Sequence, residues 1–241
     1  MGILAEDAHG VSVARALQRL LPREDLLLLC DDAHAPYARR RPDLVARRVA
    51  ELLGQLRADG AKILVLASPQ GVLDSSAAQV PGPIALVALE APIPQAAAAC
   101  GGGAVAAVVN TGSVRGRVFG HALRRQRGAS AIHFEEWPLD AAAIARRMPA
   151  LLAAGVGALA LTSPALTGLR PAIDAAAGGA LEVVEAGDVA ALRVQRTLRH
   201  AGLLSRRKRP GRLIVVSSNP GRAVGRISAT AAGARRAANR A

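Results

Sequence analysis

The sequence predicts an α/β protein with mainly parallel sheets, and three observations support this fold class. Short apolar runs alternate with amphipathic stretches along the chain, as in repeated βαβ units. The apolar runs are continuous, which is typical of strands that are buried on both faces. Hydrophobic residues make up 51% of the 241 residues. A chain of this length and composition can form one large domain or two small ones with a packed core.

Nine apolar runs are predicted to form strands, at 2–6, 25–30, 62–67, 84–88, 104–109, 129–134, 158–161, 181–185 and 212–217. A further stretch, from Met148 to Leu169, has no charged residue and is long enough to span a membrane. Prolines and glycines interrupt it, so we predict a helix end, a turn, a buried strand and a loop there. Neither an export signal nor a membrane span is expected, and we expect a cytoplasmic protein.

The amphipathic stretches are predicted to form helices, at 11–21, 42–58, 91–99, 113–126, 139–154, 167–177 and 187–203. Asp43, Asp140 and Asp188 lie at the starts of three of these helices, where an acidic side chain can cap free N–H groups. Gly60 and Gly128 follow two helices, at the position where a left-handed cap is favoured.

The nine strands could form one sheet or two smaller sheets. The Gly101-Gly102-Gly103 run is the best internal break, as either a hinge or a permissive loop. In open α/β sheets the functional crevice lies beyond the carboxyl ends of the strands. The segments of interest for function are therefore 5–10, 31–38, 67–72, 110–113 and 162–167.

The net charge of +13 is concentrated at the C-terminal end of the chain. Residues 205–241 contain ten basic residues and no acidic residue, so residues 1–204 carry only +3. The run from Ser205 to Arg209 is either a solvated loop or a contact for a protein or a polyanion such as nucleic acid. No aromatic residue lies in this tail, so base stacking is not expected there.

Several classes of site are not supported. The two cysteines, Cys30 and Cys100, lie too far apart in sequence to suggest a disulfide framework or a cysteine-rich zinc module. The five histidines show no ligand spacing, so no metal site is predicted. Neither a phosphate-binding loop nor a dinucleotide-binding glycine motif occurs. We therefore expect no cofactor.

Motifs at the predicted strand ends occur in an order and at separations that resemble a known family. They include Asp31-Asp-Ala-His-Ala-Pro36-Tyr37-Ala, Ala67-Ser68-Pro-Gln70 and Leu161-Thr-Ser163-Pro164-Ala. Over almost the whole chain this layout resembles glutamate racemase, of the aspartate/glutamate racemase family. The resemblance implies two similar α/β domains that face a central cleft, with residues 1–94 and 204–241 in the first domain and residues 95–203 in the second. It also implies cofactor-independent inversion of glutamate, which supplies D-glutamate for peptidoglycan.

The family uses two cysteines, one on each face of the substrate, as thiolate base and thiol acid. A thiol suits this role because its pKa of about 8.5 can be lowered towards neutrality. The resemblance places Ser68 and Ser163 at the two cysteine positions. A serine hydroxyl is far less acidic and needs a neighbouring base. The histidine that would assist the second cysteine is replaced by Ala165.

The residues that the resemblance assigns to substrate binding also depart from the family pattern. They are Asp7, Pro36, Tyr37, Gln70, Asn110, Ser113 and Pro164. Asp7 matches the family's first aspartate only after a shift of one or two residues; without a gap, Ala5 takes that place. The Pro-Tyr-Gly turn has lost only its glycine, whereas the contacts beside both serines are lost. Random drift in a working enzyme is not expected to change both bases and most ligand contacts while it spares the scaffold.

The sequence therefore favours a racemase-like protein without two-base activity, which acts as a binding or regulatory paralogue. The alternatives are a glutamate racemase, or a relative that uses other cleft residues. Cys30 is either a buried apolar residue or a group near the cleft. His9, His34 and the Glu135-Glu136 pair are either solvated or part of the cleft lining. We expect a small acidic ligand, a homodimer, and a contact through the basic 205–241 tail.

Overall fold

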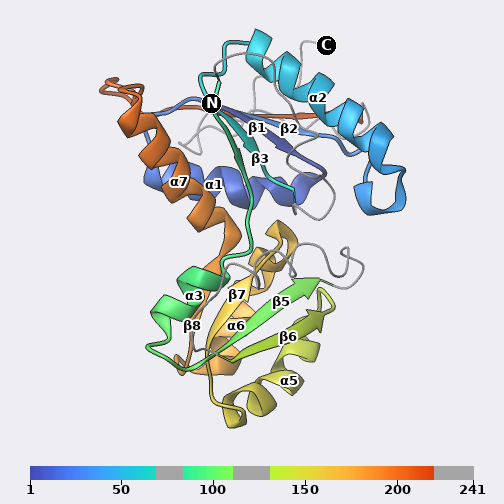
Figure 1. Cartoon of the computed structure of the whole chain (residues 1–241), viewed down its shortest axis with the longest axis vertical. Helices are drawn as coiled ribbons and strands as arrows, with labels where there is room; N and C mark the ends of the chain where they lie inside the picture. The colour runs from blue at the N-terminus through green and yellow to red at the C-terminus, as the bar shows by residue number, and fades with distance from the viewer. Residues whose placement is uncertain (69–83, 111–130, 220–241) are drawn as a thin grey trace. The chain divides into compact units, whose positions relative to one another are not determined.

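The computed structural model of the chain describes residues 1–68, 84–110 and 131–219. The chain divides into two compact units: unit 1 comprises Met1–Leu89 and Ala190–Ala241, and unit 2 comprises Glu90–Val189. Each unit contains one sheet, and all of the described strand pairs are parallel (Figure 1). The predicted α/β class with mainly parallel sheets is confirmed.

The sheet of unit 1 has the strand order β4-β3-β1-β2-β9. Its strands are β1 (Gly2–Ala5), β2 (Leu26–Cys30), β3 (Leu64–Leu66), β4 (Leu86–Ala88) and β9 (Leu213–Ser217). The C-terminal strand β9 pairs with β2 along its whole length, from Leu26 opposite Leu213 to Cys30 opposite Ser217. Because β1 lies between β2 and β3, the segments that follow these three strands emerge side by side at one edge of the sheet.

Helices α1 (Val11–Leu20) and α2 (Pro42–Ala58) cover opposite faces of this sheet (Figure 1). The buried face of α2 repeats at Val45, Val49, Leu52, Leu53 and Leu56, as expected for an amphipathic helix. These side chains pack against strand residues of the central sheet. This packing holds α2 in place, and α2 contributes Arg48 to the carboxyl edge of the sheet, where the parallel strands end.

The sheet of unit 2 has the strand order β6-β5-β7-β8. Its strands are β5 (Ala104–Asn110), β6 (Ile132–Trp137), β7 (Val156–Leu161) and β8 (Glu182–Glu185). Its helices are α3 (Ile93–Ala99), α5 (Ala141–Ala153) and α6 (Arg170–Ala177), and α7 (Ala186–His200) follows β8. Alternate residues of β5 and β7 bury opposite faces: Leu159 and Leu161 pack with α5 and α6, and Ala158 and Ala160 pack with α3. Burial on both faces explains the continuous apolar runs.

The nine predicted strands and six of the seven predicted helices are confirmed, with ends displaced by up to three residues. The remaining prediction, a helix at 113–126, lies outside the described residues, as does Gly128. Gly60 has a positive φ of 84° directly after α2, as predicted for a helix cap. In Met148–Leu169 the predicted helix end and buried strand are confirmed as α5 and β7, but the predicted loop is a short 3-10 helix, Pro164–Leu169. Within the described residues, no helix is long and apolar enough to cross a membrane.

The predicted domain boundaries, after residues 94 and 203, stay predictions. The two units meet in sequence at Leu89/Glu90 and Val189/Ala190. The Gly101–103 run is not at a junction of the units, since it connects α3 to β5 inside unit 2. Gly101 and Gly102 have φ values of 58° and 102°, which a residue with a side chain rarely adopts.

Candidate functional site at the carboxyl ends of the strands

Ser68 lies just beyond the carboxyl end of β3 and is almost fully buried. Its Oγ accepts a hydrogen bond of 3.1 Å from the backbone N–H of Glu6, which follows β1. An amide N–H is a donor and cannot take the hydroxyl proton. Among the described residues, no carboxylate or imidazole forms a hydrogen bond with Ser68, so nothing there activates its oxygen as a base.

Asp7 and Glu6 form the turn after β1. The Asp7 carboxylate accepts a hydrogen bond of 2.9 Å from the backbone N–H of His9 and so caps the short 3-10 helix Ala8–Gly10. Burial raises the pKa of Glu6, and the negative charge of Asp7 raises it further. The structure therefore brings Asp7 and Ser68 to the same edge of the sheet, next to Glu6. Glu6 was not among the predicted site residues.

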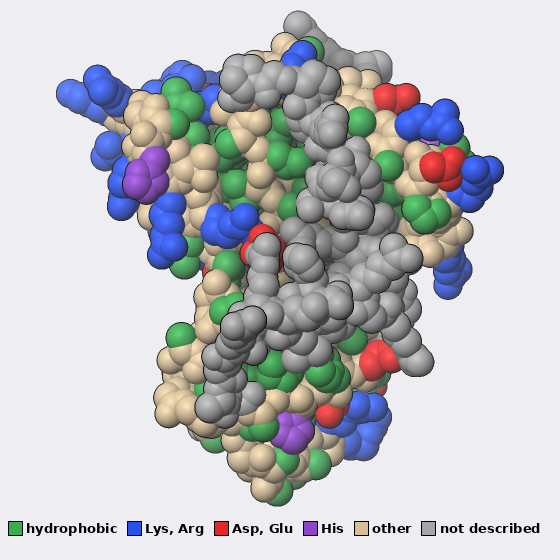
Figure 2. Space-filling model, viewed as in Figure 1, with side chains coloured by type: hydrophobic (Ala, Val, Ile, Leu, Met, Phe, Trp, Pro, Cys, Tyr) green, Lys and Arg blue, Asp and Glu red, His purple; other side chains and the backbone are tan. Residues whose placement is uncertain are grey.

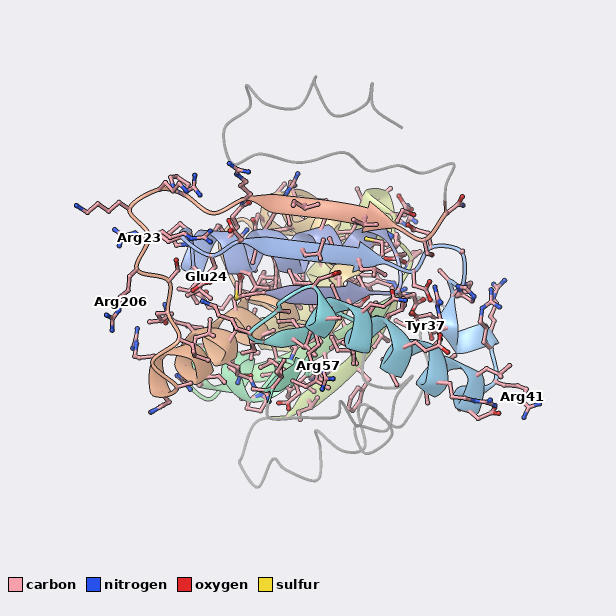
Figure 3. The ribbon with its side chains drawn as sticks, turned by 90° about the horizontal axis from the view of Figure 1, so that it is seen from above. Arg23, Glu24, Tyr37, Arg41, Arg57 and Arg206 are labelled. Atoms are coloured by element: carbon pink, nitrogen blue, oxygen red, sulfur yellow. The ribbon has the colours of Figure 1, made fainter. Side chains whose placement is uncertain are left out.

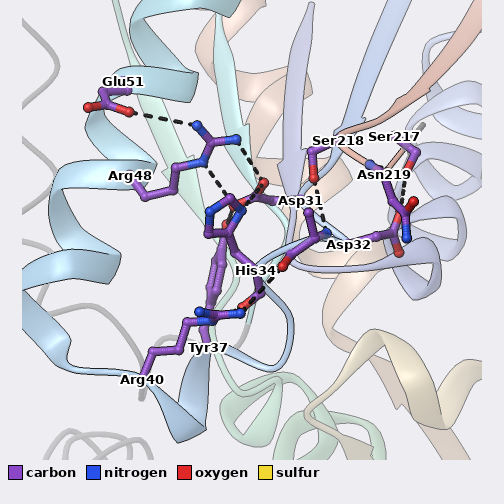
Figure 4. Close-up of polar contacts among 11 residues, drawn as sticks. Asp31, Asp32, His34, Tyr37, Arg40, Arg48, Glu51, Ser217, Ser218 and Asn219 are labelled. Carbon is purple, nitrogen blue, oxygen red and sulfur yellow. Dashed lines mark hydrogen bonds and ion pairs between the residues drawn. The ribbon is translucent and has the colours of Figure 1, made fainter. Parts of the chain in front are cut away.

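The segment after β2 is organised around Asp31, which is completely buried (Figure 4). Arg48 of α2 donates two hydrogen bonds to its carboxylate, of 3.2 Å from Nε and 3.0 Å from a terminal nitrogen. Tyr37 Oη donates a third, of 3.0 Å, and His34 Nδ1 lies 3.1 Å from the other carboxylate oxygen. Burial alone would raise the pKa of Asp31, but the hydrogen bonds from Arg48, Ser218 and Tyr37 lower it below its ordinary value.

This network holds two of the predicted site residues in place. Pro36 directly precedes the short 3-10 helix Tyr37–Arg39, and Tyr37 is buried with its hydroxyl directed at Asp31. The tyrosine side chain therefore supports the turn. Burial raises the pKa of Tyr37, and the Asp31 charge raises it further, so the hydroxyl is protonated. Arg48 was not among the predicted site residues. It lies three residues after Val45 and four before Leu52, on the apolar face of α2, and an arginine at such a position signals a buried partner.

In unit 2, three predicted site residues lie at the carboxyl ends of neighbouring strands. Asn110 is the last residue of β5, and its buried Oδ1 has no hydrogen-bond partner among the described residues. Ser163 follows β7 and is buried, and its Oγ accepts a hydrogen bond of 3.4 Å from the backbone N–H of Ala165. It thereby caps the 3-10 helix Pro164–Leu169, in which Pro164 is buried.

The hydroxyl of Ser163 resembles that of Ser68 in its surroundings. Its neighbour Thr162 donates a hydrogen bond of 2.9 Å to the carbonyl oxygen of Val108, so this hydroxyl is also directed at the backbone. In the described part of unit 2, no histidine or carboxylate forms a hydrogen bond with Ser163. Glu135, on β6, is engaged by Trp137 Nε1 at 3.1 Å and by Arg147 at 2.9 Å.

Neither cysteine supplies the missing base. Cys30, at the end of β2, is completely buried, and burial, together with the charges of Asp32 and Asp7, raises its pKa to about 12. Cys100 follows α3 and precedes β5, so it lies at the amino edge of the sheet in unit 2. Its thiol is 3.1 Å from the carbonyl oxygen of Gly103. It cannot share a site with Ser163, which lies at the opposite edge.

The remaining predicted residues give no further site. Gln70 and Ser113 lie outside the described residues. His9 is exposed in the turn after β1, and His34 is held by Asp31. Among the described residues, no group of three or more histidine, cysteine, aspartate or glutamate side chains is placed to hold a metal ion.

Comparison with known proteins identifies glutamate racemases among the similar sequences and structures. No family model matches the sequence. The glutamate racemase of Pseudomonas entomophila (strain L48) is 29% identical over 223 residues, which cover 85% of this chain and 83% of the relative. The crystal structure of glutamate racemase from Thermus thermophilus in complex with beta-chloro-D-alanine matches with a TM-score of 0.68 and 25% identity, over 91% of this chain and 88% of the other. The Escherichia coli glutamate racemase in complex with L-glutamate and the activator UDP-MurNAc-Ala matches with a TM-score of 0.69 and 16% identity, over 91% and 90%.

Proposed function

We propose that this homologue of glutamate racemases does not racemise by a two-base mechanism and acts as a binding or regulatory protein. It resembles glutamate racemases over most of its length and has their fold. The observation that carries the proposal is the environment of Ser68 and Ser163. Each hydroxyl accepts a hydrogen bond from a backbone N–H group and has no basic side chain as a partner among the described residues.

Inversion of an α-carbon requires a base on one face of the substrate and an acid on the other. A serine that acts as a base must first lose its proton to a neighbouring group, because its hydroxyl is far less acidic than a thiol. The chain has only two thiols. One is buried with a pKa of about 12, and the other lies at the amino edge of its sheet. Neither supports a thiolate at the carboxyl edges.

A second candidate function, an enzyme that uses other groups, is favoured by one observation. Glu6 lies beside Ser68 at the carboxyl edge of unit 1, and burial raises the pKa of its carboxyl group. A carboxylate with a raised pKa can act as a general base near neutral pH. A single carboxylate could exchange an α-proton but would not by itself provide the acid on the second face.

The proposal is tested by asking whether the chain supplies D-glutamate to a bacterial strain that cannot make it. We expect no growth without added D-glutamate when this chain is expressed, whereas the Pseudomonas entomophila relative should restore growth. Immunoblotting establishes that both proteins are present in equal amounts. Growth supported by this chain, and lost with either Ser68→Ala or Glu6→Gln, would overturn the proposal and identify the base.

We also propose that the protein binds a small acidic ligand, forms a homodimer and lies in the cytoplasm. The Escherichia coli neighbour holds L-glutamate, and the scaffold after β2 in this chain is intact around Asp31. We expect L-glutamate, but not L-lysine, to raise the melting temperature of the protein. Light scattering should give twice the 24.7 kDa mass of the chain. An unchanged melting temperature with both amino acids would remove the acidic ligand from the proposal.

A further inference from the structure

The loop that leads into β9, residues 205–212, concentrates positive charge at the amino edge of the sheet in unit 1. Five of its eight residues are basic, and it contains no acidic residue. Figure 3 shows Arg206 with Arg23 and Glu24 at one end of the sheet, whereas Tyr37, near the predicted site, lies towards the other end. The loop is therefore separate from the carboxyl edge.

The backbone of this loop is fixed against the turn before β2. The backbone N–H of Ser205 donates a hydrogen bond of 2.7 Å to the buried carboxylate of Glu24. The backbone N–H of Gly211 donates one of 2.8 Å to the carbonyl oxygen of Pro22. Gly211 approaches so closely that an added Cβ would lie 1.9 Å from the carbonyl oxygen of Glu24. Both ends of the loop are thus held by the segment that contains Arg23.

The basic side chains of the loop divide into matched and unmatched groups. Arg207 forms an ion pair with Asp25. Arg206, Lys208 and Arg209 are exposed, and in the described part of the chain none of them has an acidic partner. The same holds for Arg23, which is exposed between Pro22 and Glu24, the two residues that contact the loop.

Some exposed arginines elsewhere in the protein are matched by acids. Arg41 and Arg47 both contact Asp43 on α2, at 3.0 and 3.6 Å. Arg170 contacts Asp174 at 2.7 Å. Lys and Arg side chains also gather at the upper left of Figure 2, where Figure 1 draws the end of α7 and the loop after it. Arg206, Lys208 and Arg209 are thus unmatched cations grouped on a fixed backbone.

We propose that this surface, defined by Arg23, Arg206, Lys208 and Arg209, binds the phosphate backbone of nucleic acid. Arginine pairs with phosphate through two parallel hydrogen bonds, and lysine provides a point charge. Binding releases the counterions condensed on the nucleic acid, which favours association at low salt. Since the backbone of the loop is already held by Glu24 and Pro22, little loop entropy is lost on binding.

The chemistry of the loop favours nucleic acid over an acidic protein. Protein interfaces are stabilised by buried aromatic and apolar anchors. Apart from Pro210, residues 205–212 have no apolar side chain, and none is aromatic. Contacts to phosphate need only cations and carry no sequence information. The absence of aromatic residues from the loop also removes base stacking, so duplexes of different sequence should bind equally.

Fluorescence anisotropy with a labelled 20-base-pair duplex and the full-length protein tests the proposal. Replacing Arg206, Lys208 and Arg209 by glutamine should weaken binding at least about tenfold at 50 mM KCl. It should also lower the slope of log K against log[KCl] by about 2.7, or about 0.9 for each lost phosphate contact. These side chains are exposed, so the variant should keep the circular dichroism spectrum and melting temperature of the wild type.

Two variants with the same change in charge serve as controls. Replacing Arg41, Arg47 and Arg146 by glutamine, and separately Arg235, Arg236 and Arg240, should leave affinity within twofold of the wild type. Equal losses in all three variants, or a loss only in the second control, would overturn the proposal. So would displacement of the duplex by poly-L-glutamate as readily as by unlabelled duplex at equal charge, because this would indicate a surface for acidic proteins.

Discussion

The two edges of the sheet in unit 1 use charge in different ways. At the carboxyl edge, the buried carboxylate of Asp31 is matched by Arg48. At the amino edge, the buried carboxylate of Glu24 is matched in the same manner by Lys62, at 2.8 Å. Beyond Lys62, however, loop 205–212 adds cations that no described acid matches.

This difference shows where the protein has charge available for a partner. A base or a cation beside Ser68 would be needed to make its hydroxyl reactive, yet its described hydrogen bond is to a backbone amide. The charges of the carboxyl edge are instead used to hold the turn after β2. The positive charge of loop 205–212 lies at the opposite edge, which a small-molecule reaction at the carboxyl edge would not use.

The largest effect that follows concerns the thiol of Cys30. With a pKa of about 12 and complete burial, its thiolate fraction at pH 8 is about 10⁻⁴. We expect iodoacetamide to alkylate Cys30 at least about 1,000-fold more slowly in the native protein than in 8 M urea, as measured by mass spectrometry of its peptide. Rapid alkylation of the native protein at Cys30 would show a reactive thiol at the carboxyl edge and would break the comparison.

Asp31→Asn should destabilise the protein by about 3 kcal/mol, because it removes the buried carboxylate that pairs with Arg48, whose side chain is only 28% exposed. Urea unfolding at pH 7 measures this change. Asp43→Asn is the matched control at the surface of α2, where Asp43 pairs with exposed arginines; it should leave the free energy of unfolding nearly unchanged. Equal losses for the two variants would mean that the Asp31 network does not stabilise the carboxyl edge.

The amino edge can be tested by adding one methyl group. Gly211→Ala would place a Cβ against the backbone of Glu24, so β9 or the turn before β2 must shift, at a cost of about 2 kcal/mol. Gly54→Ala is the control, since a Cβ there meets nothing within 4 Å inside α2. It should stabilise the protein by about 0.5 kcal/mol. Thermal unfolding distinguishes the two, and a neutral Gly211→Ala would show that the loop is not held as described.

The smallest effect is a difference in pH dependence within the carboxyl edge. The pKa of Asp31 is lowered from its ordinary 3.8, so its contribution to stability is present above pH 3.8 and is lost as the pH falls through its folded-state value. The pKa of Glu6 is raised from its ordinary 4.5, so the contribution of Glu6 to stability is present below pH 4.5 and is lost as the pH rises through its folded-state value.

Urea unfolding from pH 3 to pH 7 separates the two groups. Glu6→Gln should remove the decrease above pH 4.5, and Asp31→Asn should remove the decrease at the acidic end. The same pH profile for both variants would contradict the opposite environments of these two carboxyl groups.

Much of the fold follows from local patterns in the sequence. Continuous apolar runs such as 104–109 and 158–161 predict strands correctly, because both faces of each strand are buried by helices. The position of β9 beside β2 is a long-range pairing, and here the family resemblance, rather than any local pattern, assigned the C-terminal segment to the first domain.

The candidate site is only partly predictable. The spacing of motifs placed Ser68 and Ser163 after strands, as the structure has them. The spacing did not indicate that both hydroxyls accept hydrogen bonds from backbone amides, or that Arg48 reaches Asp31 from a helix 17 residues further along the chain. Such contacts depend on how helices and turns pack against the sheet, which no local pattern contains.

The most direct test of the central claim is exchange of the α-proton of L-glutamate in deuterated water, followed by proton NMR. Removal of this proton is the first step of racemisation, so the measurement detects any base, whatever its identity. The structure predicts that purified protein gives no exchange above the rate in buffer, while the Pseudomonas entomophila relative exchanges the proton readily. Exchange at an enzyme-like rate that is lost with Ser68→Ala would contradict the claim, whereas exchange lost only with Glu6→Gln would favour the second candidate, an enzyme that uses other groups.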